Sequence, residues 1–318
     1  MSALAQPHQK KRSIAFKQVL MATDFSDASR RALGYALAIA HRYGSQLSVL
    51  HAIPPEPWES IPLEPMPREL NRRRLDAEQQ MQRLGQETEF GDLRHQLLLE
   101  QGRVWDVLAS VMQRENADLL VLGTHGRGGL KKLALGSVAE EVLRLASCPV
   151  LTVGPNAPPA RSGVAEFSRI LFATDFGSAS TRAFPYALSL AEDGHAKLVL
   201  LHMGPPMPSP DLGPAAFGPS AYAAEEFTQW QQTMRAKTES KLRALLPPDT
   251  ELAAEPELIT GMDFLPEGIL NPAESHQVGL IVMGANRTPA PRVAAHLPWA
   301  LTHEVICHAK CPVLTVSN

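Results

Sequence analysis

The chain reads Ala22-Thr23-Asp24-Phe25 directly after a short apolar run that begins at Gln18, and the same four residues return as Ala173-Thr174-Asp175-Phe176. A second match closes each copy, because residues 148–153 and 311–316 both read Cys-Pro-Val-Leu-Thr-Val. A repeat of about 150 residues is far longer than a solenoid unit. The sequence therefore predicts two copies of one domain rather than a repeat array.

Each copy alternates short apolar runs with segments of helical spacing. In the first copy Ser26 is a predicted N-cap, and Gly44 is a suitable residue just beyond the end of the same helix. Strands that alternate with helices favour right-handed crossovers and a parallel sheet covered by helices on both faces. The expected strands of the first copy are 18–22, 47–53, 95–100, 119–122 and 149–153, and the expected helices are 26–43, 68–84, one around 104–111, and 137–145.

The repeat sets the expected domain boundaries at 1–154 and 167–318, with a linker at 155–166. Residues 154–160 have the proline-rich composition of turns and extended linkers. The second copy is longer, and its extra residues are expected in the proline-rich stretch 203–220, whose role the sequence does not reveal.

Composition excludes several classes of protein. The chain has 318 residues, of which 44% are hydrophobic, so it is not a disordered protein. It has no apolar run long enough for a membrane span, and its N-terminus lacks the apolar core of a secretory signal. A net charge of −3 gives no general attraction to nucleic acid or anionic lipid. Three cysteines fit a reducing compartment, so we expect a cytoplasmic protein.

Two segments stand at the carboxyl ends of predicted strands, where open parallel sheets bind ligands. Thr23 and Asp24 follow the first strand, and the glycine-rich segment 123–132 follows the fourth. Glycines leave backbone N–H groups accessible, and Gly136-Ser137 opens the next helix, so this segment is predicted to cradle an anion. Arg127 adds a positive charge to it.

Neither common nucleotide motif is present, because the Walker A lysine and the third glycine of the dinucleotide fingerprint are both missing. The spacing that does occur is Gly123-x-x-Gly126, nine residues, then Gly136-Ser137. Together with the Ala-Thr-Asp-Phe and Cys-Pro-Val-Leu-Thr-Val repeats, this pattern resembles the universal stress protein family. The resemblance covers both halves, so the chain is similar to a tandem member of that family.

The resemblance implies a Rossmann-like, five-stranded parallel sheet in each domain with strand order 3-2-1-4-5, and ATP binding where the glycine signature is present. By position, Asp24 and the backbone around Ala22, Thr23 and Ala52 would hold adenine and ribose. Ribose and phosphates would lie on Gly123, Gly126, Gly136 and Ser137, with Arg127 nearby and Val138 flanking the phosphate helix. Mg²⁺ is expected with the phosphates. The function expected is that of a nucleotide-dependent stress-response module.

The second copy departs from the signature. Gly284 matches Gly123, but Arg287 stands where Gly126 would be, and Trp299-Ala300 replaces Gly136-Ser137. Three prolines (289, 291 and 298) also enter this stretch, and each removes an N–H that could have met a phosphate. We therefore predict that only the first copy binds ATP.

Other interpretations remain open. Instead of binding a ligand, Asp24 could simply cap its own turn. A slow ATP hydrolase or phosphotransferase would need a positioned base, for which His125 is the one weak candidate, so no catalytic residue is assigned. A third possible function is that of a structural or chaperone-like protein that binds no nucleotide. The spacing of His303, Cys307 and Cys311 suggests a metal, but no metal site is assigned because the first copy lacks it. The two last strands are expected to pair within the chain. A homodimer and a protein partner are both possible.

Overall fold

The computed structural model describes residues 14–55, 67–124, 135–160, 167–204, 221–262, 265–285 and 297–317. In these residues ten strands form one continuous sheet in the order β3-β2-β1-β4-β5-β10-β9-β6-β7-β8. The strands are β1 (Gln18–Ala22), β2 (Gln46–Ile53), β3 (His95–Gln101), β4 (Leu119–Gly123), β5 (Val150–Val153), β6 (Arg169–Ala173), β7 (Lys197–Gly204), β8 (Glu257–Met262), β9 (Leu280–Ala285) and β10 (Val313–Ser317). The helices are α1 (Asp27–Tyr43), α2 (Pro67–Glu87), α3 (Val104–Arg114), α4 (Ser137–Leu145), α5 (Ser178–Gly194), α7 (Ala221–Arg243), α8 (Glu267–Ser275) and α9 (Leu297–His308).

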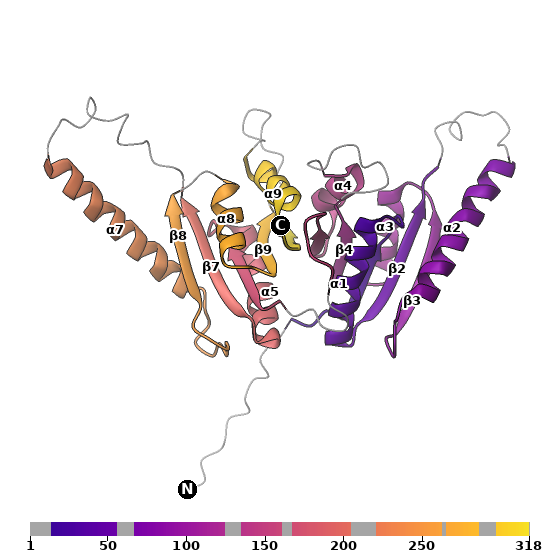
Figure 1. Cartoon of the computed structure of the whole chain (residues 1–318), viewed down its shortest axis with the longest axis horizontal. Coiled ribbons are helices and arrows are strands. Elements are labelled where there is room, and N and C mark those ends of the chain that lie inside the picture. Colours follow the sequence, from indigo (N-terminus) through magenta and orange to yellow (C-terminus); the bar gives the residue numbers. More distant parts are fainter. Residues whose placement is uncertain are drawn as a thin grey trace, which may run out of the picture.

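The sheet consists of two equivalent halves. Half one contains β1–β5 with α1–α4, and half two contains β6–β10 with α5, α7, α8 and α9. Within each half all pairs are parallel, and both halves have the predicted strand order 3-2-1-4-5. The halves join through β5 and β10, which pair antiparallel as expected for the two Val-Leu-Thr-Val strands. Figure 1 shows the halves side by side, with α2 and α7 at the two outer ends.

Helices cover both faces of the sheet, and each face has one hydrophobic core that runs through both halves. Side chains of α1, α2, α5 and α7 belong to one core. Side chains of α3, α4, α8 and α9 belong to the other. The central strands are buried on both faces, so Val19, Leu20 and Met21 of β1 are all 0% exposed. This burial explains why these strands read as continuous apolar runs rather than alternating ones.

Local signals place α1 where the sequence predicted it. Ser26 caps the helix by accepting a hydrogen bond from the backbone N–H of Ser29 at 3.2 Å. Gly44 ends it with a φ of 63°, a conformation that glycine adopts without steric cost. The helix predicted at 68–84 is α2, which begins at Pro67, a residue suited to a first turn, and continues to Glu87. The strand predicted from residue 149 begins at Val150.

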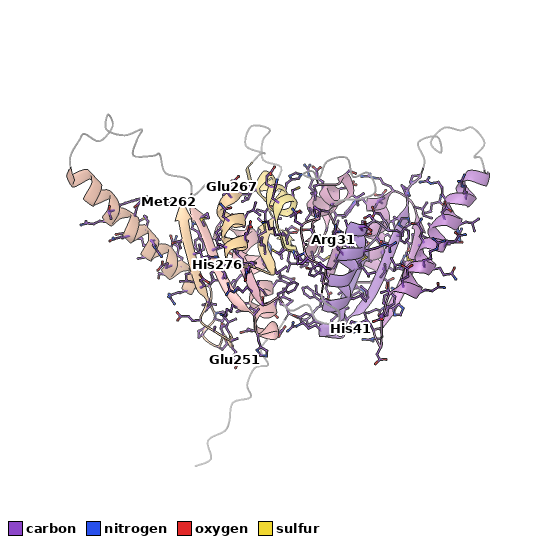
Figure 2. All side chains as sticks on the ribbon, in the orientation of Figure 1. Arg31, His41, Glu251, Met262, Glu267 and His276 are labelled. Carbon is purple, nitrogen blue, oxygen red and sulfur yellow. The ribbon has the colours of Figure 1, made fainter. Side chains whose placement is uncertain are left out.

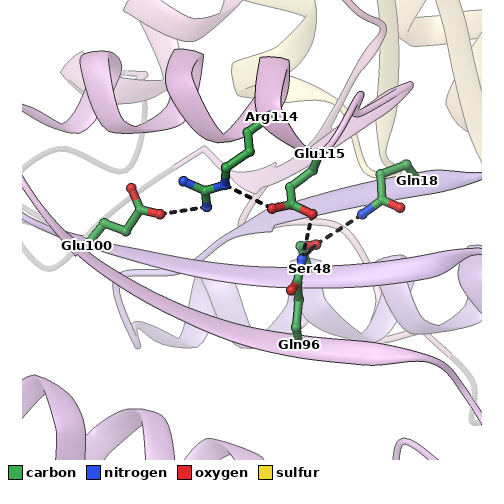
Figure 3. Close-up of polar contacts among 6 residues, drawn as sticks. All are labelled: Gln18, Ser48, Gln96, Glu100, Arg114 and Glu115. Carbon is green, nitrogen blue, oxygen red and sulfur yellow. Dashed lines mark hydrogen bonds and ion pairs between the residues drawn. The ribbon is translucent and has the colours of Figure 1, made fainter.

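A polar network ties the amino ends of three strands to the end of α3 (Figure 3). The buried hydroxyl of Ser48 accepts hydrogen bonds from Gln18 Nε2 at 3.1 Å and Gln96 Nε2 at 2.8 Å. Gln96 also donates to Glu115, which pairs with Arg114. Hydrogen bonds from Arg114 and Gln96 hold the pKa of Glu115 below its usual value. This network lies at the end of the strands opposite the predicted ligand edge, so its role is structural.

Across the part of the chain that the structure describes, we find no helix with both the length and the apolar character needed to cross a bilayer.

Candidate functional site at the carboxyl edge of half one

Side-chain hydroxyls build the turn that follows β1. The buried Thr23 Oγ1 accepts a hydrogen bond from the N–H of Phe25 at 3.0 Å and donates to Ser29 Oγ at 3.1 Å. Ser29 in turn donates to the carbonyl of Ser26 at 2.9 Å. The turn after β6 repeats this arrangement, with Thr174 donating to Ser180 at 3.0 Å. These contacts fix the direction in which the chain leaves the sheet.

A histidine on the neighbouring strand holds each of these turns from the side. His51 Nδ1 lies 2.7 Å from the carbonyl oxygen of Thr23, and since a carbonyl only accepts, Nδ1 carries the hydrogen. The ring of Phe25 packs on His51 with centroids 4.4 Å apart. Phe25 has a φ of 63°, a left-handed conformation that is costly for a bulky residue. Strain of this kind persists only where surrounding contacts enforce it, and such positions cluster at functional sites.

Half two keeps the same geometry. His202 lies 2.7 Å from the carbonyl of Thr174, and Phe176, with a φ of 60°, packs on His202 at 4.6 Å. His51 and His202, which recur at the same position of the repeat, therefore have the same hydrogen-bonding and packing role in both halves.

The two aspartates of the repeat make different contacts. Asp24 Oδ1 accepts a hydrogen bond from the N–H of Ser26 at 3.0 Å, so Asp24 does brace its own turn. Asp175 Oδ1 accepts two, from Gly177 N at 2.8 Å and from Ser180 Oγ at 2.7 Å. Two residues after Asp175, a Cβ on Gly177 would be 2.9 Å from the Asp175 carboxylate, so glycine at that position lets the carboxylate lie close over the turn. Ser26 occupies the corresponding position in half one.

Gly123 and Gly284 are explained by packing. A Cβ at Gly123 would come within 2.8 Å of the Ala28 carbonyl carbon and 3.0 Å of the Ser29 nitrogen, both in the first turn of α1. A Cβ at Gly284 would overlap the first turn of α5 in the same way. The glycine shared by both halves therefore permits close approach of a strand end to a helix. This contact gives Gly123 a structural reason that does not depend on a ligand.

Backbone hydrogen bonds join the described residues on either side of the loop between β4 and α4. Gly136 N donates to the carbonyl of Thr124 at 2.9 Å, and Thr124 N donates to the carbonyl of Val153 at 3.1 Å. Gly136 is the N-cap of α4 and gives it no side-chain cap. Ser137 and Val138 in the first turn are exposed, the latter at 37%. The exposed first turn of α4 therefore lies beside the sheet edge, and the first N–H groups of a helix have no partner within the helix itself. Two residues of the predicted cradle, Gly126 and Arg127, lie outside the described residues, as does His125.

The remaining predicted residues lie on adjacent strands of this edge. Ala22 pairs in register with Leu50 of β2 and Leu122 of β4, so the turn after β1 lies between the ends of those two strands. Ala52 lies near the end of β2, and both alanines are half-buried. The strand order reverses between β1 and β4, and this is the position where open α/β sheets bind ligands.

Half two has a different helix start at the equivalent edge. The repeat aligns Trp299 with Gly136, yet α9 already begins at Leu297, whereas α4 begins only at Ser137. The helix in half two is therefore about one turn longer at its N-terminus, and that turn contains Pro298, which has no N–H. Arg287, Pro289 and Pro291 lie outside the described residues.

The other suggested chemistry finds little support in the structure. His303 Nδ1 lies 3.9 Å from Cys307 Sγ, and burial raises the pKa of both Cys307 and Cys311. Within the described ranges no three histidine, cysteine or acidic side chains gather as a metal site would require.

Sequence reasoning missed the buried serines and the strained phenylalanines of the two turns. Ser29 and Ser180 recur at the same spacing of 151 residues as the aspartates, so the repeat itself carried that signal. Phe25 also lines a groove of about 810 Å³ between α1 and α2, together with Leu33 and Leu37. Phe25 thus contacts His51 of the candidate site and also borders the groove.

Comparison with known proteins agrees with this geometry. The model of the Universal stress protein family matches residues 15–154 and again residues 166–317. A universal stress protein of Thermus aquaticus, encoded in a QAH/OAS sulfhydrylase 3′ region, is 38% identical over 138 residues, which are 43% of this chain and 98% of that protein. Universal stress protein MJ0531 of Methanocaldococcus jannaschii is 30% identical over 142 residues, 43% of this chain and 82% of that protein.

A crystal structure of a universal stress protein from Archaeoglobus fulgidus covers 94% of this chain and 98% of its own, with a TM-score of 0.63. At 20% identity this likeness shows the fold alone. Because the family model matches both halves, the chain belongs to the universal stress protein family and carries two of its domains in tandem.

Proposed function

We propose that half one binds ATP with Mg²⁺ at the carboxyl edge of its sheet, and that half two does not. The observation that supports the proposal is the start of α4 at Gly136, an N-cap residue that itself gives no side-chain cap, beside the strained turn after β1. A helix N-terminus without a side-chain cap is a favourable place for phosphate, because N–H groups and the helix dipole both attract negative charge.

The charges at this edge support one direction for the bound nucleotide. The Asp24 carboxylate would repel a triphosphate, so it suits the ribose hydroxyls, with adenine against the backbone near Ala22 and Ala52. The phosphates would then lie over Gly136 and Ser137. Each charge-assisted contact contributes about 1.5–3 kcal/mol, so a few of them, less the cost of immobilising the ligand, give roughly micromolar binding.

Half two has lost the phosphate end of this arrangement. Its helix starts about a turn earlier and includes Pro298, and its aspartate is held by two donors of its own turn. We propose that ATP in half one is the signal that the protein carries in a stress response. Phe25 would pass that signal on, since it joins the site to the groove between α1 and α2.

A charge placed at the phosphate end tests the proposal. Ser137→Asp adds a carboxylate to the first turn of α4, where it stabilises the helix but repels phosphate. We expect calorimetric titration to show ATP binding weakened by about tenfold or more, with adenosine binding unchanged. Ala300→Asp, at the equivalent position of half two, is the matched control and should leave both affinities at the wild-type value. Equal loss of ATP affinity in both variants, or in neither, would refute the site.

A further inference from the structure

The two halves pack against each other with a repeated set of aromatic contacts. Phe16 stacks on Tyr186 with ring centroids 6.0 Å apart, and Phe167 stacks on Tyr35 at 6.3 Å. Phe16 and Phe167 are equivalent positions of the repeat, and so are Tyr35 and Tyr186. In each half, the phenylalanine that precedes the first strand thus packs on the first helix of the other half, as it would between two identical subunits. This part of the interface does not distinguish one half from the other.

The contacts between the C-terminal ends of α1 and α5, at the bottom of Figure 1, are not symmetric. Arg42 and Asp193 are equivalent positions of the repeat, and the Arg42 guanidinium donates to the main-chain carbonyl of Asp193. Tyr43 Oη donates to the Asp193 carboxylate at 3.1 Å. Figure 2 labels His41, which precedes Arg42, at this end of α1. Equivalent residues can touch each other only at a two-fold axis, so this contact marks the axis.

The shapes of the two sides also differ in a complementary way. Gly194 is the counterpart of Tyr43, and a Cβ at Gly194 would be in ordinary contact with Arg42 Nη2, at 3.5 Å. Arg42 therefore lies directly over Gly194, where the ring of a tyrosine would have to share its space. Ser189, whose counterpart is Ala38, places its hydroxyl 3.3 Å from Asp193 Oδ2. Half one supplies a cation and a phenol, and half two supplies a carboxylate, a helix-end carbonyl and room.

We infer that a contact between Arg42 and Tyr43 of half one and Asp193 and Gly194 of half two, here called the pairing contact, favours the association of unlike halves. The same residues disfavour the association of two like halves. Two copies of half one would bring Arg42 against Arg42 and put Tyr43 where space is needed. Two copies of half two would bring two Asp193 carboxylates together without a cation or a phenol. Unfavourable like-charge contacts of this sort are an effective means of excluding a wrong partner.

A consequence is that two copies of half one from different molecules do not pair with each other. The symmetric contacts alone would allow a half one to pair with a half one of another molecule, through β5 and the same aromatic residues. The pairing contact removes that option, so each half one is matched with a half two.

The test rebuilds the excluded contacts inside the full-length chain. The double variant Asp193→Arg, Gly194→Tyr reproduces the contact that two copies of half one would make. The double variant Arg42→Asp, Tyr43→Gly reproduces the contact that two copies of half two would make. Exchanging all four residues restores the complementary contact in the opposite sense. Lys237→Asp, an equal charge change at an exposed position of α7, is the control.

We expect each double variant to lower the folding equilibrium constant, measured by urea unfolding, about tenfold or more, because like charges then face each other. The fourfold exchange should recover most of that loss, and the control should match the wild type. If a double variant does not fold, recovery of folded protein in the fourfold exchange is itself the expected result. Double variants as stable as the wild type, or a fourfold exchange no better than they are, would overturn the inference.

Discussion

Leu151 of β5 faces Leu314 of β10 across the antiparallel pair, and the two leucines occupy the same position of the repeated Cys-Pro-Val-Leu-Thr-Val motif. On either side of them Thr152 and Thr315 each donate a hydroxyl hydrogen bond to the main chain of the opposite strand, at 3.1 and 3.3 Å. A pseudo-two-fold axis therefore passes between the leucines. Because the halves share this symmetric frame, each half serves as an internal control for the other.

The first prediction concerns the strand-end glycines. Gly284→Ala should lower the free energy of unfolding by about 1–3 kcal/mol, the usual range for overpacking, because the added methyl overlaps the first turn of α5. Gly204→Ala is the control, since the nearest atom to its Cβ is 3.7 Å away. Urea unfolding measures both variants, and a Gly284→Ala protein as stable as the control would contradict the packing account.

The histidines that brace the two turns provide a matched pair. His51→Leu and His202→Leu each leave a threonine carbonyl without its partner, so each should cost about 1–3 kcal/mol of stability. Only His51→Leu should also weaken ATP binding, because it loosens the turn that carries Asp24. Thermal unfolding and titration with ATP check the two effects separately. Loss of ATP affinity in His202→Leu would show that half two takes part in binding.

The third prediction is a dependence on alkaline pH. Burial, then the charge of Asp193 and the hydrogen bond to it, raise the pKa of the Tyr43 phenol above its ordinary value of 10.0. An acid whose pKa is raised on folding stabilises the protein fully below its unfolded pKa, and this contribution is lost as pH rises toward the folded pKa. The free energy of unfolding should therefore fall above pH 10 less steeply in Tyr43→Phe than in the wild type.

Part of the alkaline slope should remain in that variant. Burial also raises the pKa of Tyr35, to about 12, and that of Cys311, to about 12. Urea unfolding at a series of pH values from neutral upward supplies the slopes. If those of the wild type and of Tyr43→Phe coincide, the pKa of Tyr43 is not coupled to folding.

Much of the fold could be predicted because its signals are local. The apolar run of β1 predicts a strand buried on both faces, and Ser26 and Gly44 indicate the two ends of α1. The end of α2 at Glu87 could not be placed, because its last residues are mostly exposed and add nothing to the helical period. The linker also does more than its composition suggests, since the carbonyl of Pro158 accepts a hydrogen bond from Tyr35 Oη.

The candidate site was predictable in position but not in contacts. Repetition located Asp24, yet it could not show that Asp24 braces Ser26 or that Gly123 is needed against Ala28. These contacts depend on how a helix lies across a strand end. The contact between Arg42 and Asp193 could not be predicted from the sequence at all, because it forms only when the two halves pack against each other. Sequence periodicity describes elements one at a time and says little about such long-range approach.

We propose one anion-binding edge per chain, in half one. Native mass spectrometry of the full-length protein with saturating Mg²⁺ and ATP counts the bound nucleotides, with Ser137→Asp as the comparison. We expect one ATP bound per chain in the wild type and a strongly reduced bound fraction in the variant. Two ATP molecules per chain, or one that persists unchanged in Ser137→Asp, would contradict it.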